Sequence, residues 1–347
     1  LREFVESVGE KPYRSQQLYG WMYAKCARSF DEMTDLPREF RSLLKERATL
    51  GNLEAVTRQT SQLDGTTKLL FRLEDGLMIE SVLIPAERES ATEAARLTLC
   101  VSTQVGCPLD CKFCATGTMG FSRNLTVGEI ADQVLFFQAS TESRISNVVF
   151  MGMGEPMLNY ENLMKAIDIL SSDHGLNIGR KHITVSTAGY ADHIRRMADE
   201  DRKVRLALSL HSLDNEKRLL LMPINKKYPL PVLLDSVEYY YRKTRQRPTF
   251  EYILFEGLND TREDLQKLVS LSKRIPSKIN LIPFHSIDVT RPTSIASTLR
   301  PASDQRMEEF AKNLRAANVT VMIRSSAGED IDAACGQLAV SEENITT

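Results

Sequence analysis

Three cysteines lie within eight consecutive residues of this chain, in the segment Cys107-Pro-Leu-Asp-Cys111-Lys-Phe-Cys114. Three thiolates on one loop can hold three irons of a [4Fe–4S] cluster and leave the fourth iron open to a substrate. A closed zinc site normally has four protein ligands, so zinc would need Cys100 as a fourth. Cysteines bunched in this way favour metal or redox chemistry over a disulfide framework. We therefore expect a metal centre, with a cluster favoured over zinc.

Polar residues also follow several short apolar segments further along the chain. Gly154 and Glu155 come after an apolar segment at 148–150. The glycine would let backbone approach a ligand, and the carboxylate could accept a hydrogen bond from an ammonium group. Each of the others, taken singly, is better explained as a helix cap or a satisfied strand-end residue. Their joint placement at strand ends favours a ligand site. The other candidates are Ser186, Ser209, Leu210 and His211.

The elements that must position these residues form a regular alternation from Leu97 onward. Long segments between the apolar ones, such as 126–139 and 229–242, could be crossover helices, which indicates parallel βα units. We expect an α/β fold, a complete or partial (β/α) barrel, with the chemistry at the carboxyl ends of its strands. The predicted strands are 97–103, 147–151, 182–187, 204–210, 249–254, 278–283 and 319–324.

The part of the chain before these strands predicts two smaller units. Apolar residues at helical spacing, and Pro37 at the start of a second helical segment, predict a helical accessory domain. Two β-like segments joined by Glu74-Asp75-Gly76 predict a β-hairpin that links this domain to the rest. The predicted division is 1–60 for the accessory domain, 61–96 for the hairpin linker and 97–347 for the core.

The composition is that of an ordinary globular protein, with 42% hydrophobic residues, 26% charged residues and a formal net charge of −2. This total neither supports nor excludes a nucleic-acid partner, because the distribution of the basic residues decides that. No segment approaches the roughly 20 apolar residues that span a bilayer, and the first residues do not form a secretory leader. We expect a soluble cytoplasmic protein without membrane contact.

The cysteine spacing resembles the signature of the radical S-adenosylmethionine (SAM) superfamily, and the whole chain resembles its RlmN/Cfr family of RNA methyltransferases. The resemblance implies a barrel of the radical SAM type and a [4Fe–4S] cluster whose open iron chelates SAM. An electron from this cluster would split SAM to a 5′-deoxyadenosyl radical. SAM contacts would come from the polar candidates named above. The matching segments are Cys100–Cys107, Phe113–Gly117, Asn124–Ile130, Gly152–Asn159, Leu221–Asn225, Asn280–Phe284 and Asp330–Leu338.

Two residues bear on which member of the family the chain resembles. The RlmN type methylates adenine C2 in 23S ribosomal RNA and in a subset of tRNAs, whereas the Cfr type acts at C8. An alanine commonly follows Gly-Met-Gly-Glu in the Cfr type, so Pro156 favours C2. His285 stands where many members carry Asn, and its imidazole could still contact SAM. A Cfr-type enzyme, a radical SAM enzyme of other substrate and a zinc-containing RNA-binding protein remain the alternatives.

Adenine C2 has almost no nucleophilicity, so methylation there requires a carbon radical. The resemblance implies that Cys335 accepts a methyl group from one SAM and that a second SAM yields the radical that activates it. Cys100 would then attack the sulfur of Cys335, form a disulfide and release the RNA, with Glu80 as proton acceptor. Without the resemblance, both cysteines could equally be buried core thiols, and Glu80 would belong to a solvated strand face.

The resemblance also implies 23S rRNA and tRNA substrates and an electron donor such as a flavodoxin system; we expect a monomer. Basic clusters at 179–182, 195–196 and 242–247 could bind phosphate, although solvated helix ends are the commoner explanation. The accessory domain is the better candidate for binding RNA, because aromatic and basic residues occur together there. These residues are Tyr13, Arg14, Gln16, Gln17, Trp21 and Arg28.

Overall fold

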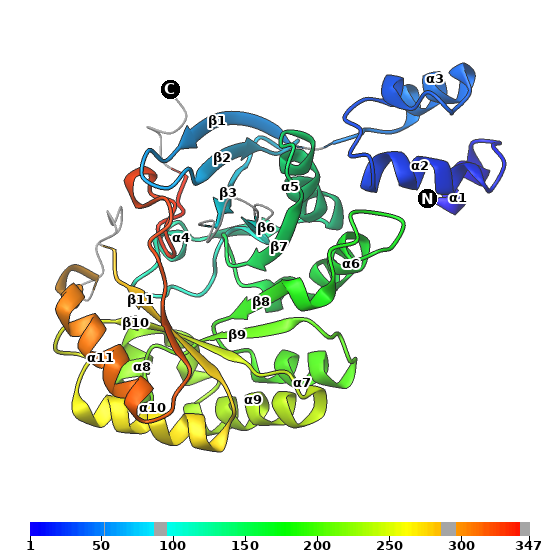
Figure 1. The fold of residues 1–347 in the computed structure, drawn as a ribbon. Coiled ribbons are helices and arrows are strands. Elements are labelled where there is room, and N and C mark those ends of the chain that lie inside the picture. The colour runs from blue at the N-terminus through cyan, green and yellow to red at the C-terminus, as the bar shows by residue number, and fades with distance from the viewer. Residues whose placement is uncertain (52, 87–95, 286–295, 341–347) are drawn as a thin grey trace.

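The computed structural model describes residues 1–51, 53–86, 96–285 and 296–340. A curved 10-stranded sheet forms its centre, in the order β1-β2-β3-β4-β7-β8-β9-β10-β11-β12 (Figure 1). From β4 to β12 all neighbouring strands are parallel. The parallel strands are β4 (Leu97–Cys100), β7 (Ile145–Phe150), β8 (Ile183–Thr187), β9 (Arg205–Ser209), β10 (Thr249–Leu254), β11 (Lys278–Pro283) and β12 (Val321–Ile323).

These seven strands are the ones predicted from the sequence, with their ends shifted by a few residues. Helices cover the outer face of the parallel sheet (Figure 1), and most residues of its strands are buried, which explains the nearly continuous apolar strands. Several helices begin at strong caps, such as the capping box of Thr126 and Glu129. The helices are α5 (Val127–Ala139), α6 (Tyr160–Leu170), α7 (Ala191–Asp199), α8 (Asn215–Leu221), α9 (Leu230–Thr244), α10 (Arg262–Arg274) and α11 (Asp304–Ala316).

Three antiparallel strands extend the sheet beyond β4: β1 (Glu54–Thr60), β2 (Thr67–Arg72) and β3 (Met78–Pro85). The predicted hairpin is formed by β2 and β3. The strand β1 was not predicted, and it occupies the last seven residues of the range predicted as helical. As the edge strand it is largely solvent-exposed, so it lacks the apolar alternation that identifies a half-buried strand.

The N-terminal helices form a small unit with a hydrophobic core of its own. They are α1 (Arg2–Ser7), α2 (Arg14–Tyr23) and α3 (Arg38–Arg47), and their core contains Val5, Leu18, Met33, Phe40 and Leu44. An ion pair between Arg28 and Asp132 of α5 ties this unit to the barrel, and the backbone N–H of Leu53 donates to the same carboxylate at 3.2 Å.

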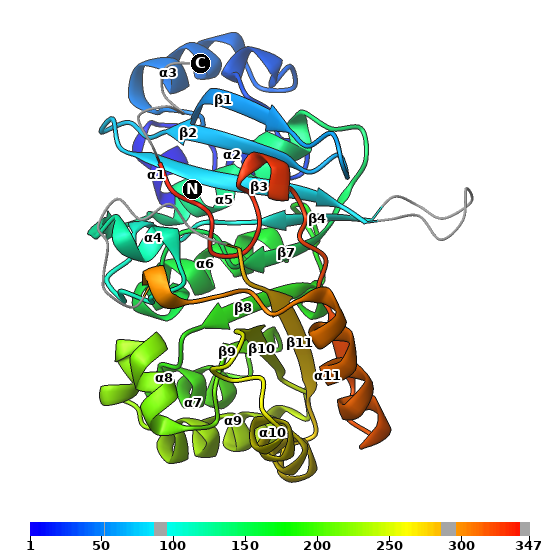
Figure 2. The ribbon, with the colours of Figure 1, turned by 90° about the vertical axis from the view of Figure 1, so that its left-hand side faces the viewer.

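Two irregular segments lie at the carboxyl ends of the parallel strands. The first follows β4 and contains β5 (Gln104–Gly106), α4 (Ala115–Thr118) and β6 (Phe121–Asn124). The second, residues 324–340, follows β12 and crosses toward β2 and β3 (Figure 2). It is held there by Asp64 and Lys68. The short 3-10 helices are η1 (Phe30–Glu32), η2 (Pro156–Asn159), η3 (Arg180–His182), η4 (Pro223–Lys226), η5 (Ala296–Thr298) and η6 (Glu329–Ile331).

No helix within the described ranges has the length and apolar character that a bilayer crossing demands.

Candidate functional site

Two adjoining cavities open at the carboxyl ends of the parallel strands. We call the smaller one, of about 140 Å³, the loop cavity, because Cys107, Cys111 and Cys114 all line it. We call the larger one, of about 240 Å³, the tail cavity, because Cys100 and much of the 324–340 segment line it. The two cavities have a common wall, so a group in that wall faces both. The residues of this wall are Cys114, Met151, Gly152, Ile282, Arg324, Cys335 and Gly336.

The short β5–β6 ribbon fixes the start of the cysteine loop. The N–H of Cys107 donates to the carbonyl of Gly120 at 2.7 Å. Gly106 has a φ of +72°, and a Cβ there would lie 2.0 Å from the same carbonyl oxygen. Only glycine allows this approach, so the turn that brings the three thiols to the cavity depends on Gly106.

The three thiols of the loop act on one another electrostatically. Burial, and then the nearby Cys114, raise the pKa of Cys107 to about 12. Burial also raises the pKa of Cys111, with further increases from Cys114 and Cys107. Three thiolates here would therefore need a strongly cationic partner, which the irons of a cluster supply. The donor set fits a [4Fe–4S] cluster.

A single metal ion has different requirements from a cluster. Among the described residues, no three His, Cys, Asp or Glu side chains are grouped closely enough to hold one ion. A cluster does not require such grouping, because each thiolate binds a different iron. All six cysteines of the chain are free thiols in this structure, so the disulfide expected as a step of the reaction is not present.

The glycines after β7 pack against protein. A Cβ on Gly152 would lie 2.7 Å from the Ser102 hydroxyl, and one on Gly154, at φ +99°, would lie 2.5 Å from the Gln104 Cβ. These contacts bring the loop after β7 against the segment that leads from β4 to the cysteines. Both glycines also line the loop cavity. The sequence suggested only the approach of a ligand, whereas close packing alone already demands glycine at both positions.

Glu155 is a buried carboxylate at the loop cavity. It accepts hydrogen bonds from the backbone N–H groups of Met157 at 3.0 Å and Ala188 at 2.7 Å. Burial raises its pKa to about 7, and these hydrogen bonds oppose that rise. A carboxylate held in this way can accept from a cationic ligand group, which would also restore its charged form.

Three of the remaining polar candidates, Ser186, Ser209 and His211, line the loop cavity together. The N–H of Ile253 donates to Nδ1 of His211 at 3.0 Å, which leaves the ring proton on Nε2. Burial, with a contribution from Arg218, lowers the pKa of His211 to about 3, so the ring is neutral. Leu210 is fully buried and does not belong to the cavity lining.

His285 lies apart from the other candidate SAM contacts. It lines the tail cavity, where its Nε2 is 2.8 Å from the Ser326 hydroxyl and its Nδ1 is 3.2 Å from the Glu329 carboxylate. Both ring nitrogens therefore contact the 324–340 segment.

Cys335 lies in the common wall because its neighbours bind the cysteine loop. The N–H of Ala115 donates to the carbonyl of Gly336 at 2.7 Å, and the Thr116 hydroxyl donates to the carbonyl of Leu338 at 2.6 Å. Gly336 has a φ of +87°, and a Cβ there would lie 3.0 Å from the Phe113 carbonyl oxygen. These contacts place Cys335, from the C-terminal part of the chain, next to a loop more than two hundred residues earlier.

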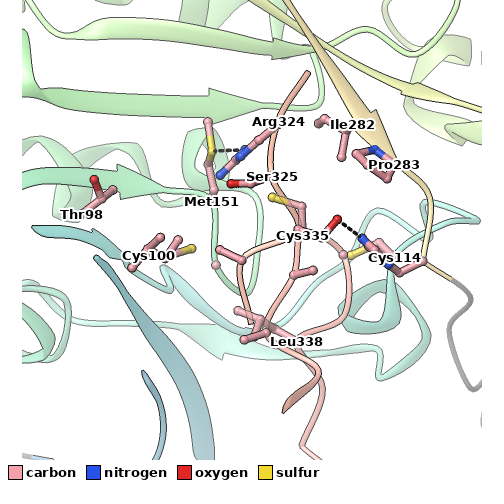
Figure 3. A pocket seen from close by; sticks show the side chains of 18 of the residues that line it. Thr98, Cys100, Cys114, Met151, Ile282, Pro283, Arg324, Ser325, Cys335 and Leu338 are labelled. Carbon is pink, nitrogen blue, oxygen red and sulfur yellow. Dashed lines mark hydrogen bonds between the residues drawn. The ribbon is translucent and has the colours of Figure 1, made fainter. Parts of the chain in front are cut away.

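Cys100, at the end of β4, faces the tail cavity together with Cys335 (Figure 3). Burial, and then the nearby Cys335, raise its pKa to about 12, and Arg324 opposes this rise. The structure therefore brings together the two cysteines outside the cysteine loop that the sequence singled out.

Arg324 is a residue of the site that the sequence reasoning missed. It follows β12, lines both cavities, and its Nη1 lies 3.4 Å from the Met151 sulfur and 3.9 Å from the Glu251 carboxylate (Figure 3). The nearby Cys335, more than any other group, raises the pKa of Arg324. The guanidinium is thus a cation on whose pKa both Cys335 and Cys100 act. A charged residue directly after an apolar strand was the available signal.

Glu80 is fully buried on β3 but belongs to the lining of neither cavity. Its carboxylate lies 3.2 Å from the Lys68 ammonium, and neither oxygen has a well-aligned hydrogen-bond donor within the described part of the chain. Burial raises its pKa to about 7; Lys68 opposes this rise and Asp332 adds to it. Since Lys68 also donates to the Asp332 carbonyl, the 324–340 segment lies next to the carboxylate.

Two family models match the chain, "Radical SAM superfamily" over residues 101–270 and "Ribosomal RNA large subunit methyltransferase N-terminal domain" over residues 1–50. A protein of Flavobacterium johnsoniae named probable dual-specificity RNA methyltransferase RlmN is 43% identical over 99% of this chain and 96% of its own length. The chain belongs to the RlmN family. A relative of the same name from Thermotoga sp. is 44% identical over 99% of this chain and 96% of its own length.

The fold agrees with this assignment. The crystal structure of a radical SAM methyltransferase from Sphaerobacter thermophilus matches with a TM-score of 0.88 and 38% identity, over 97% of this chain and 96% of that one. Helices α1, α2 and α3 fall within the RlmN N-terminal domain. Membership of the radical SAM superfamily implies a [4Fe–4S] cluster and SAM.

Proposed function

We propose that this RlmN-family protein methylates adenine C2 in 23S rRNA and in tRNA, and that Cys335 carries the methyl group. The observation that supports this proposal is the position of Cys335 in the wall common to both cavities. A methyl carrier must meet the source of the radical on one side and a resolving thiol on the other. The loop cavity provides the first, and Cys100 in the tail cavity provides the second.

The loop cavity binds the cofactors in this proposal. Cys107, Cys111 and Cys114 hold the cluster, which when bound supplies the electron that cleaves SAM to a carbon radical. Glu155 accepts from the ammonium group of SAM, and Ser186, Ser209 and His211 offer hydrogen-bonding groups to its other polar atoms. Cys335 lines the same cavity, so a SAM molecule bound there would present its methyl group to this thiol.

The first chemical step is an ordinary displacement. The Cys335 thiolate attacks the methyl carbon of one SAM, so that a sulfur–carbon bond forms while the sulfonium–carbon bond breaks and S-adenosylhomocysteine leaves. Arg324 lines both cavities together with Cys335, and its positive charge there would favour the thiolate. The radical from a second SAM then removes one hydrogen atom from the new methyl group, and the resulting carbon radical adds to adenine C2.

Release of the RNA requires Cys100. The adduct must lose one electron, which a cluster held by Cys107, Cys111 and Cys114 would take up, and its C2 proton, for which we propose Glu80 as the base. The Cys100 thiolate then attacks the sulfur of Cys335, a disulfide forms, and the bond from that sulfur to the methylene carbon breaks. The electron pair stays with the carbon, which takes up a proton to become the methyl group. A two-electron reductant, such as a dithiol, restores both thiols.

Glu80 can reach the RNA only if the 324–340 segment shifts, since the carboxylate lies outside both cavities. That segment also carries Cys335. Binding of an adenine in the tail cavity would displace the 324–340 segment and expose the Glu80 carboxylate at the stage where the proton must leave.

In this proposal the N-terminal unit binds the RNA. Tyr13 is half exposed, and the guanidinium of Arg14 lies 4.8 Å from the centre of its ring. The Trp21 ring, in contrast, is already covered by Lys25 at 3.4 Å. A splayed base can stack on such an exposed aromatic, and neighbouring cations neutralise phosphate.

Each basic cluster on the barrel contains a residue that forms an ion pair within the protein. Arg180 pairs with Asp168 at 2.7 Å, and Arg196 pairs with Glu161 and Glu200, each at 2.6 Å. These ion pairs favour the interpretation of the clusters as solvated surface over a phosphate-binding role.

The test is the position of the methyl group. The reconstituted protein is incubated without oxygen with SAM, a chemical reductant and either a 23S rRNA fragment or tRNA, and the nucleosides are compared with 2-methyladenosine and 8-methyladenosine standards by chromatography and mass. The proposal predicts 2-methyladenosine in both RNAs. Production of 8-methyladenosine would instead identify a Cfr-type enzyme and remove the argument from Pro156.

A further inference from the structure

Arg218 of α8 is a completely buried cation whose hydrogen-bond partners are all neutral. Its exposed fraction is 0%. One terminal nitrogen donates to the Asn225 side-chain oxygen at 2.9 Å, and the other donates to the carbonyls of Ala188 at 2.6 Å and Ser209 at 3.2 Å. Its Nε has no hydrogen-bond partner in the described part of the chain. A buried guanidinium normally pairs with a carboxylate, and here none of these acceptors carries charge.

A buried charge without a counter-charge is strongly unfavourable, so a cation kept in this place needs an anion close by. The counter-charge is therefore expected from an anion bound in the adjacent loop cavity, which Ala188 and Ser209 line.

The surroundings of the guanidinium agree with that placement. Ala188 and Ser209, whose carbonyls receive its hydrogen bonds, both line the loop cavity. The N–H of Lys112 donates to the carbonyl of Leu221 at 2.9 Å, which ties the cysteine loop to the end of α8. Arg218 thus lies directly behind the wall of the loop cavity, which the three cysteines line.

A [4Fe–4S] cluster held by three thiolates is the anion that this cation lacks. Three thiolates on a doubly positive core leave one net negative charge, and the entry of an electron makes it two. A fixed cation nearby favours the more negative state. Because Arg218 is buried, salt screens this interaction far less than it screens an exposed pair.

We propose that Arg218 is a positioning residue that compensates the charge of the cluster, raises its reduction potential and so eases the electron entry that SAM cleavage needs. This inference rests on the proposed function only in requiring a cluster at the three cysteines. The residue does not touch substrate; it acts through the cluster.

The test compares midpoint potentials of the reconstituted holoprotein. Arg218→Met should shift the potential to a more negative value, and Arg218→Lys, which keeps the charge, should stay nearer to the wild type. Lys217→Met is the matched control, because it removes a neighbouring cation that is partly exposed and already paired with Asp264 at 3.0 Å. Its potential should not move. An Arg218→Met potential equal to that of the wild type, or an equal shift in Lys217→Met, overturns the proposal.

A second pair of variants tests the charge without removing the guanidinium, in case Arg218→Met does not fold. Asn225→Asp puts a carboxylate where the side-chain amide oxygen of Asn225 now accepts from Arg218. Asn225→Leu removes the same amide without adding charge. Both lose the hydrogen bonds that Asn225 donates to Asn215. The potential should fall in Asn225→Asp and not in Asn225→Leu; equal potentials contradict the inference.

Iron analysis and the visible spectrum of the wild type distinguish a failure of the proposed function from a failure of the inference about Arg218. A wild type that binds no iron–sulfur cluster contradicts the proposed function, and with it the inference. A wild type that binds the cluster, but whose potential does not respond to Arg218→Met, contradicts the inference alone.

Discussion

The two cavities use the same chemical group in different ways. The three thiols of the cysteine loop come from one short segment, held by the β5–β6 ribbon and by glycines that pack against backbone. The two other thiols that line the tail cavity, Cys100 and Cys335, come from opposite ends of the core and meet only because the 324–340 segment folds back. In the proposed mechanism, radical generation therefore depends on local sequence, whereas methyl transfer depends on the complete tertiary fold. Mutations should therefore separate the two functions.

The largest expected effect is that of Cys335→Ala. Methylated RNA should fall to background, while iron content and reductive SAM cleavage remain, because the loop cavity keeps its three thiols. Measurement of 5′-deoxyadenosine and of methyladenosine in the same reaction checks both. Cys26→Ala is the control, since it removes a buried thiol of the N-terminal unit that faces neither cavity. Full product from Cys335→Ala would show that methyl transfer does not need this thiol.

Cys100→Ala should stop the reaction one step later. The methyl group reaches the RNA, but nothing attacks the Cys335 sulfur, so protein and RNA stay joined. A denaturing gel with labelled RNA should show a slow band that nuclease removes. If this variant releases free methylated RNA at the wild-type rate, Cys100 is not the resolving thiol.

Glu80→Gln should slow RNA release by about a hundredfold to ten-thousandfold, the usual contribution of a general base. The carboxylate accepts a proton only when ionised, and its pKa is raised to about 7 by burial. The wild-type rate should therefore rise with pH up to about 7 and level off above it, and the variant should lose this rise. Methylation of Cys335 should be unaffected. An unchanged pH profile would exclude Glu80 as the acceptor.

Arg324→Met should have a smaller effect, confined to the thiol steps. A charge-assisted interaction is worth roughly 1.5–3 kcal/mol, so methylation of Cys335 should be about tenfold slower or more. Peptide mass spectrometry of the C-terminal fragment follows this step, and Arg324→Lys should recover part of the rate. Equal methylation rates in both variants and the wild type would show that Arg324 only fills space.

Much of the fold could be predicted, because the parallel strands are buried on both faces and appear as separate apolar segments. The cysteine loop could be predicted for a similar reason, since its three ligands are close in sequence. The edge strand β1 could not, as its exposed residues carry no apolar alternation.

The contributions of Arg218, Arg324 and His285 depend on tertiary structure. Arg218 looks like any helical arginine until its complete burial and neutral partners are known. Arg324 matters because Cys335 folds back onto it, and His285 contacts the same segment through both ring nitrogens. Nothing in the local sequence specifies these tertiary contacts.

The most direct test of the account follows the hydrogen atoms of the methyl group. SAM with a fully deuterated methyl group is supplied, and products formed after the first turnover are analysed by mass. Passage through Cys335 as a carbon radical predicts that the product methyl keeps two deuterium atoms and gains one hydrogen from solvent, while 5′-deoxyadenosine carries one deuterium. A product methyl group that retains all three deuterium atoms would contradict the account, because the methyl would then have passed to the RNA without being activated on Cys335.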